Sequence, residues 1–292
     1  MANEIGNTEL TATKQEIITE LAQRALISES VLMPTFRDLS TFAGKGMSQI
    51  SFPKNSALFT VENRASATAG TNQSLAFAKD TMDLDVRAHI QWVVDTDDEM
   101  ESSLDVQREL IERASREHAR DFDARAIVKM EAAGITTTTA GTISQDIVLE
   151  MRQILLQNKA NPRDLWLAVA PAQEAALLKI DPFVAADQYG SAIVPMGVLG
   201  TLYGVKVVVT PELGDSQYFM YEREGFGFAL QRGPAFDESP KPEFGVNAKL
   251  QVLAQKYGQL ALQQGVPGAF QADGSTALGA AESALIVKDN NA

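Results

Sequence analysis

The residues that could do chemistry in this chain are few, and their spacing forms no catalytic pattern. His89 and His118 are its only histidines. Neither stands near a nucleophile or a set of metal ligands, so both are interpreted as polar residues that pack within the fold. The chain contains no cysteine, which excludes disulfides, thiolate nucleophiles and cysteine-bound metals. The sequence therefore predicts no catalytic, cofactor-binding or metal-binding residue.

Two further patterns suggest chemistry but have simpler explanations. The glycines around Gly200 and Gly204 lack both the P-loop lysine and the dinucleotide fingerprint, so they are predicted to form turns. Asp97, Asp98 and Glu99 form an acidic run, which the N-terminus of a helix favours by itself. Because the paired acids of a glycosidase need proximity in space and not in sequence, a carboxylate-dependent hydrolase stays open as an alternative.

The longest expected element is a helix from Thr96 to Gly134, and both of its ends are marked. Thr96 and Glu99 form a capping box, and Gly134 is expected to stop the helix in the left-handed conformation. Apolar residues recur at intervals of three, four and seven, which predicts one buried face on an otherwise charged helix. The residues of this face are Met100, Leu104, Ile111, Ala114, His118, Phe122, Ala126 and Met130.

A long strand is expected immediately before this helix. Residues 81–95 alternate between apolar and polar side chains, which indicates a strand with one buried face. A second strand lies upstream, and its alternation changes phase at Pro53, Lys54 and Asn55, as a bulge or edge break requires. Residues 63–80, between the two strands, are small and polar. The prediction is a long two-stranded arm with a mobile tip, which must lie on another surface because an isolated hairpin is marginally stable.

The rest of the chain is predicted to alternate short helices and strands. Residues 13–30 suit an amphipathic helix, and residues 31–46 suit a loop with short strand-like pieces. Residues 135–142 are rich in threonine and glycine and are predicted to link two lobes. Beyond them the sequence predicts a helix at 144–158, buried strands at 165–170 and 205–210, paired strands at 217–222 and 226–232, a proline-broken loop at 233–242 and a strand at 247–264.

Composition limits the class of protein further. The 292 residues are 45% hydrophobic, which is enough for a large core in one body or in two lobes. The formal net charge is −13, which argues against broad electrostatic binding to nucleic acid. No apolar run reaches the length of a membrane span, so no membrane partner is expected.

The order of these parts resembles the major capsid proteins of tailed bacteriophages, which share the Hong Kong-type capsid fold. The resemblance rests on a polar N-terminal arm, the hairpin sequences ISFPKNSALFTVENRASATAGTNQ and DTMDLDVRAHIQWVVDTDDE, the long helix, and the segments LWLAVAPAQEAALLKI and GTLYGVKVVVTPEL. It depends on order and spacing more than on any invariant signature. It implies an α+β protein with an N-terminal arm at 1–48, an extended loop (β-hairpin) at 49–95, a peripheral domain with the spine helix at 96–142, an axial domain at 143–232, and a return to the peripheral domain with the C-terminal tail at 233–292.

The resemblance implies assembly and not catalysis. The chain is expected to be a structural protein, not an enzyme, that self-assembles as hexamers and pentamers into an icosahedral head shell. This shell would form in the host cytoplasm, become part of the virion and enclose double-stranded DNA without sequence-specific binding. Other copies of the chain, a portal protein and a decoration protein are the expected partners. Because only about thirty residues precede Val31, a separate scaffolding protein is also expected.

Two further points follow from the resemblance. Some relatives crosslink a lysine of the extended loop to an asparagine of a neighbour. Lys54, Lys79 and Asn247 have suitable types, but no motif marks them, so no crosslink is predicted. An encapsulin-like nanocompartment, which encloses an enzyme in place of DNA, is the alternative within the same fold.

Overall fold

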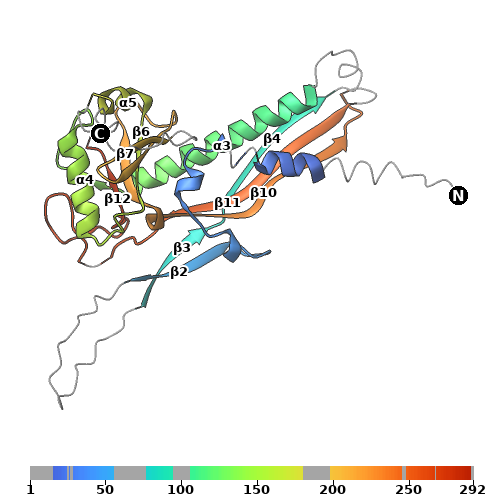
Figure 1. The fold of residues 1–292 in the computed structure, drawn as a ribbon. Helices are drawn as coiled ribbons and strands as arrows, with labels where there is room; N and C mark the ends of the chain where they lie inside the picture. Colours follow the sequence, from blue (N-terminus) through green and yellow to red (C-terminus); the bar gives the residue numbers. More distant parts are fainter. Residues whose placement is uncertain are drawn as a thin grey trace. The chain divides into compact units, whose positions relative to one another are not determined.

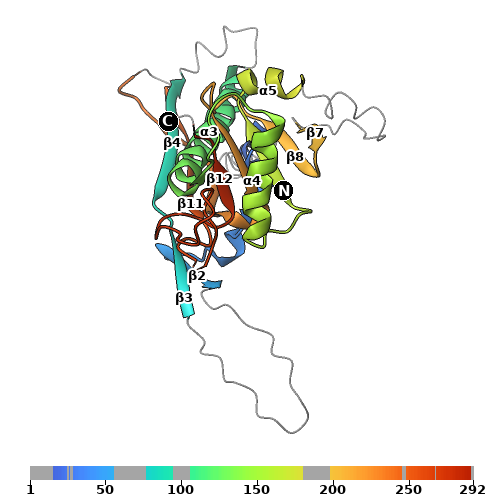
Figure 2. The same ribbon diagram turned by 90° about the vertical axis from the view of Figure 1, so that its left-hand side faces the viewer.

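The computed structural model describes residues 16–24, 26, 29–55, 77–94, 106–179, 198–244, 248–266 and 268–290, which form two compact units (Figures 1 and 2). Unit 1 contains the residues up to Ser48, Leu84–Ala126 and Phe228–Gln259. Unit 2 contains Gln49–Asp83, Ile127–Gly227 and the residues from Leu260 onward. The chain passes from one unit to the other inside α3 (Val106–Ala133), β10 (Phe226–Pro240) and β11 (Lys249–Ala261).

Unit 1 is a four-stranded sheet that packs against the first part of α3. Its strands lie in the order β1 (Arg37–Asp38), β10, β11 and β4 (Val86–Val94). β11 and β4 are antiparallel, with Leu253 opposite Ile90. Side chains alternate between half-buried and exposed along all of β4, which confirms the predicted alternation of this strand. The strand predicted at 247–264 is confirmed as β11.

The core of unit 1 lies between α3 and the sheet, because both present one apolar face. The ring of Phe122 meets Phe228 edge to face, with centroids 5.5 Å apart, and lies 5.2 Å from the ring of Tyr257. A helix at residues 16–24 closes this core with Ala22, which is fully buried. The predicted inward face of α3 is confirmed from Ile111 to Met130, because its members are buried at helical spacing: Ile111, Ala114, His118, Phe122, Ala126 and Met130.

Unit 2 contains a six-stranded sheet and the helix α4 (Gln145–Gln157). The strand order is β5, β12, β9, β6, β8 and β7, with β6 parallel to β8 and antiparallel to β9. The bounds of these elements, and of the helix that follows β6, are β5 Ile135–Thr136, β6 Leu165–Val169, α5 Pro171–Leu177, β7 Val198–Leu202, β8 Val205–Val209, β9 Tyr218–Glu222 and β12 Ile286–Lys288.

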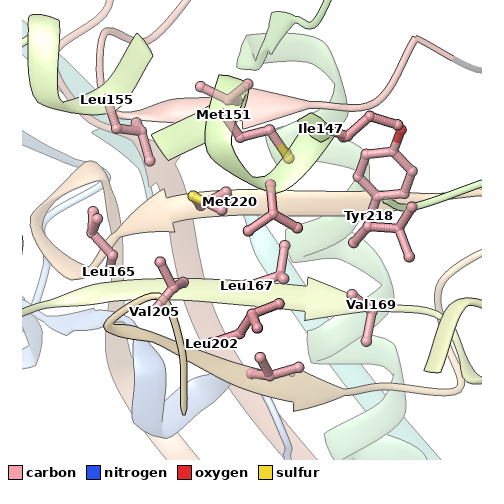
Figure 3. Close-up of a cluster of buried hydrophobic side chains, with 14 of the residues drawn as sticks. Ile147, Met151, Leu155, Leu165, Leu167, Val169, Leu202, Val205, Tyr218 and Met220 are labelled. Atoms are coloured by element: carbon pink, nitrogen blue, oxygen red, sulfur yellow. The ribbon is translucent and has the colours of Figure 1, made fainter. Parts of the chain in front are cut away.

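The core of unit 2 forms where α4 covers the sheet. Ser144 caps this helix by accepting a hydrogen bond from the backbone N–H of Ile147 at 3.4 Å. The predicted apolar face of α4 is buried, and β6 and β9 are almost entirely buried, as their continuous apolar runs predict. Figure 3 shows the side chains of α4, β6 and β9 gathered into one cluster. Pro171 stands at the start of α5, where its missing N–H costs no hydrogen bond.

A separate two-stranded sheet, here called the β2–β3 ribbon, also belongs to unit 2 (Figure 1). It pairs β2 (Gln49–Asn55) antiparallel with β3 (Phe77–Asp83). Pro53 lies inside β2, opposite Lys79. Proline is tolerated here because each strand of a two-stranded sheet has a free edge on which no N–H is needed.

The strand predicted at 81–95 is two strands with different partners, so the prediction of one long strand was wrong. β3 pairs with β2, whereas β4 pairs with β11. Between them the N–H of Leu84 donates to the carbonyl of Ser48 at 2.8 Å. The alternation runs through the break because Leu84 is buried in phase with both strands, so it could not reveal the change of partner. Residues 77–80, predicted as part of the tip, belong to β3, and residues 56–76 lie outside the described residues.

The predicted hairpin at 217–222 and 226–232 was also wrong. β9 is flanked by β12 and β6, so both of its edges are occupied, and β10 belongs to the other sheet. β10 then continues through the predicted proline-broken loop. There the helix at 16–24 covers it: Gln23 Nε2 donates to the carbonyl of Pro234 at 3.5 Å, and the N–H of Phe236 donates to Thr19 Oγ1 at 3.2 Å.

α3 ends where predicted, but for a different reason. The N–H of Gly134 donates to the carbonyl of Met130 at 2.7 Å, yet Gly134 does not adopt a left-handed conformation. A Cβ there would lie 3.0 Å from the carbonyl oxygen of Met130 and 3.1 Å from Lys288 Cβ, so a larger residue would crowd both. The predicted linker at 135–142 begins with β5, a strand of the six-stranded sheet. Although α3 is long, no helix in the described ranges is long and apolar enough to cross a membrane.

Candidate functional site

The two histidines occupy different environments, and the predicted packing role of His118 is confirmed. His118 is buried, with its Nε2 atom 3.1 Å from the carbonyl oxygen of Leu253. Burial removes water from the charged form and lowers the pKa of His118. His89 lies on the exposed side of β4, so the predicted packing role was wrong for this residue. Within the described part of the chain no three His, Cys, Asp or Glu side chains are placed to hold a metal ion.

The predicted turn is confirmed at Gly204, whereas the prediction of a turn at Gly200 was wrong, because this residue lies inside β7. Gly200 (φ 134°) lies at the irregularity in the β7–β8 pairing, and Gly204 (φ 79°) follows Tyr203 in the tight turn between these strands. Both angles are in the region that favours glycine. The acidic run at 97–99 and the predicted capping box lie outside the described residues.

Polar groups in unit 1 join elements together. Asp123 of α3 accepts hydrogen bonds from Ser30 Oγ at 2.6 Å and from the N–H of Val31 at 3.0 Å. The hydroxyl of Tyr257 donates to Asp121 at 3.1 Å, and burial together with the nearby charge of Asp121 raises the pKa of Tyr257. These carboxylates are therefore acceptors for fixed donors, and the tyrosine is held protonated.

The β2–β3 ribbon is fixed by a buried ion pair. Lys54 Nζ lies 3.4 Å from Asp80 Oδ1, and it also donates to the carbonyl of Gln264. The other oxygen of Asp80 accepts a hydrogen bond from the N–H of Gln263 at 2.7 Å. The ribbon is thus tied to the segment that follows β11. Because a two-stranded sheet is marginal alone, this tie gives the ribbon a defined direction within unit 2.

This geometry also bears on the residues considered for a crosslink. Lys54 is engaged by Asp80 and is mostly buried, so its amine is not presented to a neighbour. Lys79 is exposed on β3. Asn247 lies outside the described residues.

Exposed large apolar side chains are distributed over both units. Val128 on α3 is 64% exposed, and Phe244 is 67% exposed. Single exposed apolar residues are common on protein surfaces. The others are Ile17, Leu21, Phe42, Met47 and Val93 in unit 1 and Leu149 and Leu178 in unit 2.

Sequence reasoning missed the ion pair between Lys54 and Asp80 in the ribbon. The segment before Thr81 was interpreted as a polar tip because no large apolar residue repeats there. The inward positions of β3 are instead Ala78, Asp80 and Met82, so a buried carboxylate occupies the place where an apolar residue would have revealed the strand. The alternation of inward and outward positions from residue 78 onward was the only feature of the sequence that indicated this strand.

Comparison with known proteins identifies the class of protein. A family model described as phage capsid protein matches residues 79–252, more than half of the chain. A structure from Mycobacterium phage Che8 has 15% sequence identity and a TM-score of 0.67, with 89% of this chain and 91% of that chain covered. The capsid structure of the cyanophage P-SCSP1u gives 12% identity and a TM-score of 0.60, with 88% and 86% covered.

A further structural relative is a virus-like particle from Pyrococcus furiosus. It has 9% identity and a TM-score of 0.60, with 95% of this chain and 99% of that chain covered. No curated protein matches the sequence significantly.

These results confirm the expected α+β fold of the Hong Kong type and the resemblance to phage major capsid proteins. The low identities to solved structures establish the fold alone. The family match rests on the sequence itself, and it extends from β3 through α3 and β5 to β10 into β11. The chain is a capsid shell protein, and it belongs to the phage capsid protein family.

Proposed function

We propose that this protein is the major capsid protein of a tailed bacteriophage, and that it assembles as hexamers and pentamers into an icosahedral head that encloses double-stranded DNA. The observation that carries the proposal is the family match across residues 79–252. The capsid folds of the phage structures support it.

The regions of the chain take the following roles in this proposal. The β2–β3 ribbon is the base of an extended loop that reaches a neighbouring subunit, and α3 is the spine helix. The proposed regions are an N-terminal arm at 1–48, the extended loop at 49–95, the peripheral domain at 96–142, the axial domain at 143–232, and the return to the peripheral domain with the tail at 233–292.

The distribution of contact areas supports assembly through many interfaces. A symmetric shell repeats each contact between subunits, so several moderate interfaces hold it without a single strong one. The exposed apolar side chains of both units provide small areas of this kind. The buried tie between Lys54 and Asp80 supports the role of the ribbon, because a directed loop reaches its neighbour with less loss of conformational entropy.

The chemistry of the subunit supports a container that does not bind DNA by sequence. Its net charge of −13 disfavours general attraction to the phosphate backbone, which suits a shell that must release its genome. The proposed partners are other copies, a portal protein, a separate scaffolding protein and a decoration protein. Assembly is proposed to occur in the host cytoplasm.

An encapsulin-like compartment is a second candidate. It is favoured by the likeness to the virus-like particle from Pyrococcus furiosus, which covers nearly the full length of both chains. The two functions differ in cargo, because a phage head contains nucleic acid and a compartment contains protein.

Electron microscopy of the purified protein tests the proposal. The chain is expressed alone and together with a candidate scaffolding protein, and fractions from size-exclusion chromatography are imaged in negative stain. We expect closed shells or rings the size of a hexamer. Nuclease-protected DNA in particles from an infected host would support the phage head, and a protein cargo would support the compartment. A uniform monomer or dimer under both expression conditions would contradict both.

A further inference from the structure

Unit 1 contains a concave site with a basic lining, although the chain as a whole is strongly acidic. This site, here called the basic hollow, has a volume of about 390 Å³. Its walls come from the loop after the short helix η2 (Ser40–Phe42) and from β4, β10 and β11. Among the described residues, no acidic side chain lines it, and the charged lining consists of Lys45, Arg87, Arg232 and Lys256, with His89 beside them.

Within the part of the chain that the structure describes, the cations of the basic hollow have no acidic partner. Arg87 and Lys256 stand directly opposite each other in the β4–β11 pairing. Like charges in opposed positions destabilise a pair of strands, so nothing within the sheet favours this arrangement. Across the described ranges, no carboxylate lies within ion-pairing distance of Lys45, Arg87, Arg232 or Lys256.

Other basic residues of unit 1 behave differently. On α3, Arg113, Arg120 and Arg125 each pair with an acidic residue three or four positions earlier, at 2.6, 3.1 and 2.9 Å. Local charge pairing is therefore the usual arrangement on this helix. The cations of the basic hollow are not paired in this way. A concave cluster of unpaired cations is complementary to an anion from outside unit 1.

The edge of the basic hollow is held in place and carries apolar side chains. Gln231 of β10 donates hydrogen bonds to the carbonyls of Gly44 and Met47, at 2.8 and 2.7 Å, which fixes the loop that supplies Lys45. On the same loop Met47 is 44% exposed, and Phe42, just before it, is also exposed. A partner that fits this surface carries both negative and apolar groups.

A protein segment meets these requirements better than DNA does. A duplex binds along an extended basic track, whereas this site is a hollow with room for only a few side chains.

We infer that the basic hollow receives a carboxylate-bearing segment of a second copy of this chain, an inference that rests on the proposed assembly. Each copy has 38 acidic residues against 25 basic ones, so neighbouring copies repel unless their acids meet a basic site. Such a contact turns part of the repulsion into attraction at the interface.

Zero-length crosslinking tests the inference directly. Shells are assembled from equal amounts of unlabelled and ¹⁵N-labelled protein and treated with a water-soluble carbodiimide. The reagent activates an Asp or Glu carboxyl, and a lysine amine within contact distance displaces the urea by-product to form an amide. We expect Lys45 or Lys256 joined to an acidic residue, in peptide pairs that combine the two labels. Pairs that never combine the labels would overturn the inference, because the acid would then come from the same copy.

Charge reversal gives an independent test. The variant Arg87→Glu with Lys256→Glu keeps like charges opposite each other, so the strand pairing carries the same repulsion as before. We expect its unfolding temperature to be maintained while the protein concentration needed for assembly rises about tenfold. The matched control, Arg163→Glu with Lys179→Glu, makes the same charge change at exposed positions of unit 2 and is expected to shift that concentration much less.

The outcomes separate this inference from the proposed function. Normal assembly of the charge-reversed variant, together with absent crosslinks at Lys45 and Lys256, would overturn the inference and leave the capsid proposal standing. Protection of these lysines from amine-reactive reagents in DNA-filled particles but not in empty ones would overturn it in favour of nucleic acid. Failure of the unchanged protein to assemble would overturn both.

Discussion

Removal of one member of the Lys54 and Asp80 pair gives the sharpest test of how the ribbon is held. The side chains of these residues are 17% and 4% exposed, with Lys54 Nζ 3.4 Å from Asp80 Oδ1. The substitution Asp80→Ala leaves the ammonium with the carbonyl of Gln264 and leaves the N–H of Gln263 without its acceptor. Breaking a buried ion pair in this way costs about 3–5 kcal/mol. Because Lys54 keeps one acceptor and some contact with water, we expect the lower limit, about 3 kcal/mol.

Hydrogen exchange measured by mass spectrometry can detect this change locally. The ribbon has only two strands, so the lost free energy is expected to appear as more frequent local opening of β2 and β3. A loss of about 3 kcal/mol corresponds to roughly hundredfold faster exchange. Peptides that cover Gln49–Asn55 and Phe77–Asp83 report on the ribbon. A peptide from α4 serves as the internal control and is expected to keep its exchange rate.

A double substitution separates the ion pair from other effects. In Lys54→Met with Asp80→Ala neither side chain is charged, so no unpaired charge is left buried. The ribbon of this variant is expected to exchange more slowly than in either single variant. The reasoning is refuted if Asp80→Ala exchanges within about threefold of the unchanged protein, or if the two single effects simply add in the double variant.

Three further predictions concern the stability of the two units, measured by thermal unfolding with all variants in the same assembly state. Because burial lowers the pKa of His118 below its ordinary 6.5, the unfolded chain takes up this proton first as the pH falls. The unfolding temperature is therefore expected to be highest above pH 6.5 and to fall as the pH drops below it. His118→Gln should make this fall less steep. An unchanged dependence on pH would contradict the assignment of the effect to His118. Gly225→Ala would place a Cβ 2.7 Å from Leu285 Cβ, so we expect a loss of about 1–3 kcal/mol. Gly214→Ala meets only a flexible side chain and should change stability by less than about 0.5 kcal/mol, and equal effects at the two glycines would refute the steric argument. Both polar atoms of the Gln255 amide are buried without a hydrogen-bond partner in the described part of the chain. Gln255→Met is therefore expected to stabilise unit 1 by about 1 kcal/mol. A lower unfolding temperature would show that the amide has a partner.

Elements with one buried face were predictable from the sequence. The inward residues of α3 and α4 recur at helical spacing because each helix packs on a single surface. β6 and β8 were correctly predicted to be buried strands, because apolar side chains occupy nearly every position of β6 and most of β8. In each case a local pattern of apolar residues reflects a local environment.

The pairing of strands was not predictable, because alternation reports a buried face and not the neighbouring strand. β3 and β4 share one unbroken alternation although they belong to different sheets. β9 and β10 follow each other closely, yet the short helix η4 (Arg223–Gly225) separates two sheets at that point. Contacts distant in sequence decide these partners.

The polar sites were hidden for a related reason. Asp80 gives no sign in the sequence that it is buried, because its partner Lys54 is 26 positions away. The basic hollow gathers Lys45, Arg87, Arg232 and Lys256 from four segments, and each of these alone reads as an ordinary solvated residue. Only the fold brings their charges together.

The position of Pro53 within the β2–β3 ribbon has a consequence for colloidal behaviour. A ribbon with two open edges is a template for the addition of further strands, which leads to fibrils and precipitates. Pro53 offers no N–H at its place in β2, and the ammonium group of Lys79 stands opposite it on β3. Both features oppose edge-to-edge stacking of ribbons from different molecules. At the high protein concentration that assembly requires, the ribbons are therefore less prone to amyloid-like aggregation and stay available for side-chain contacts.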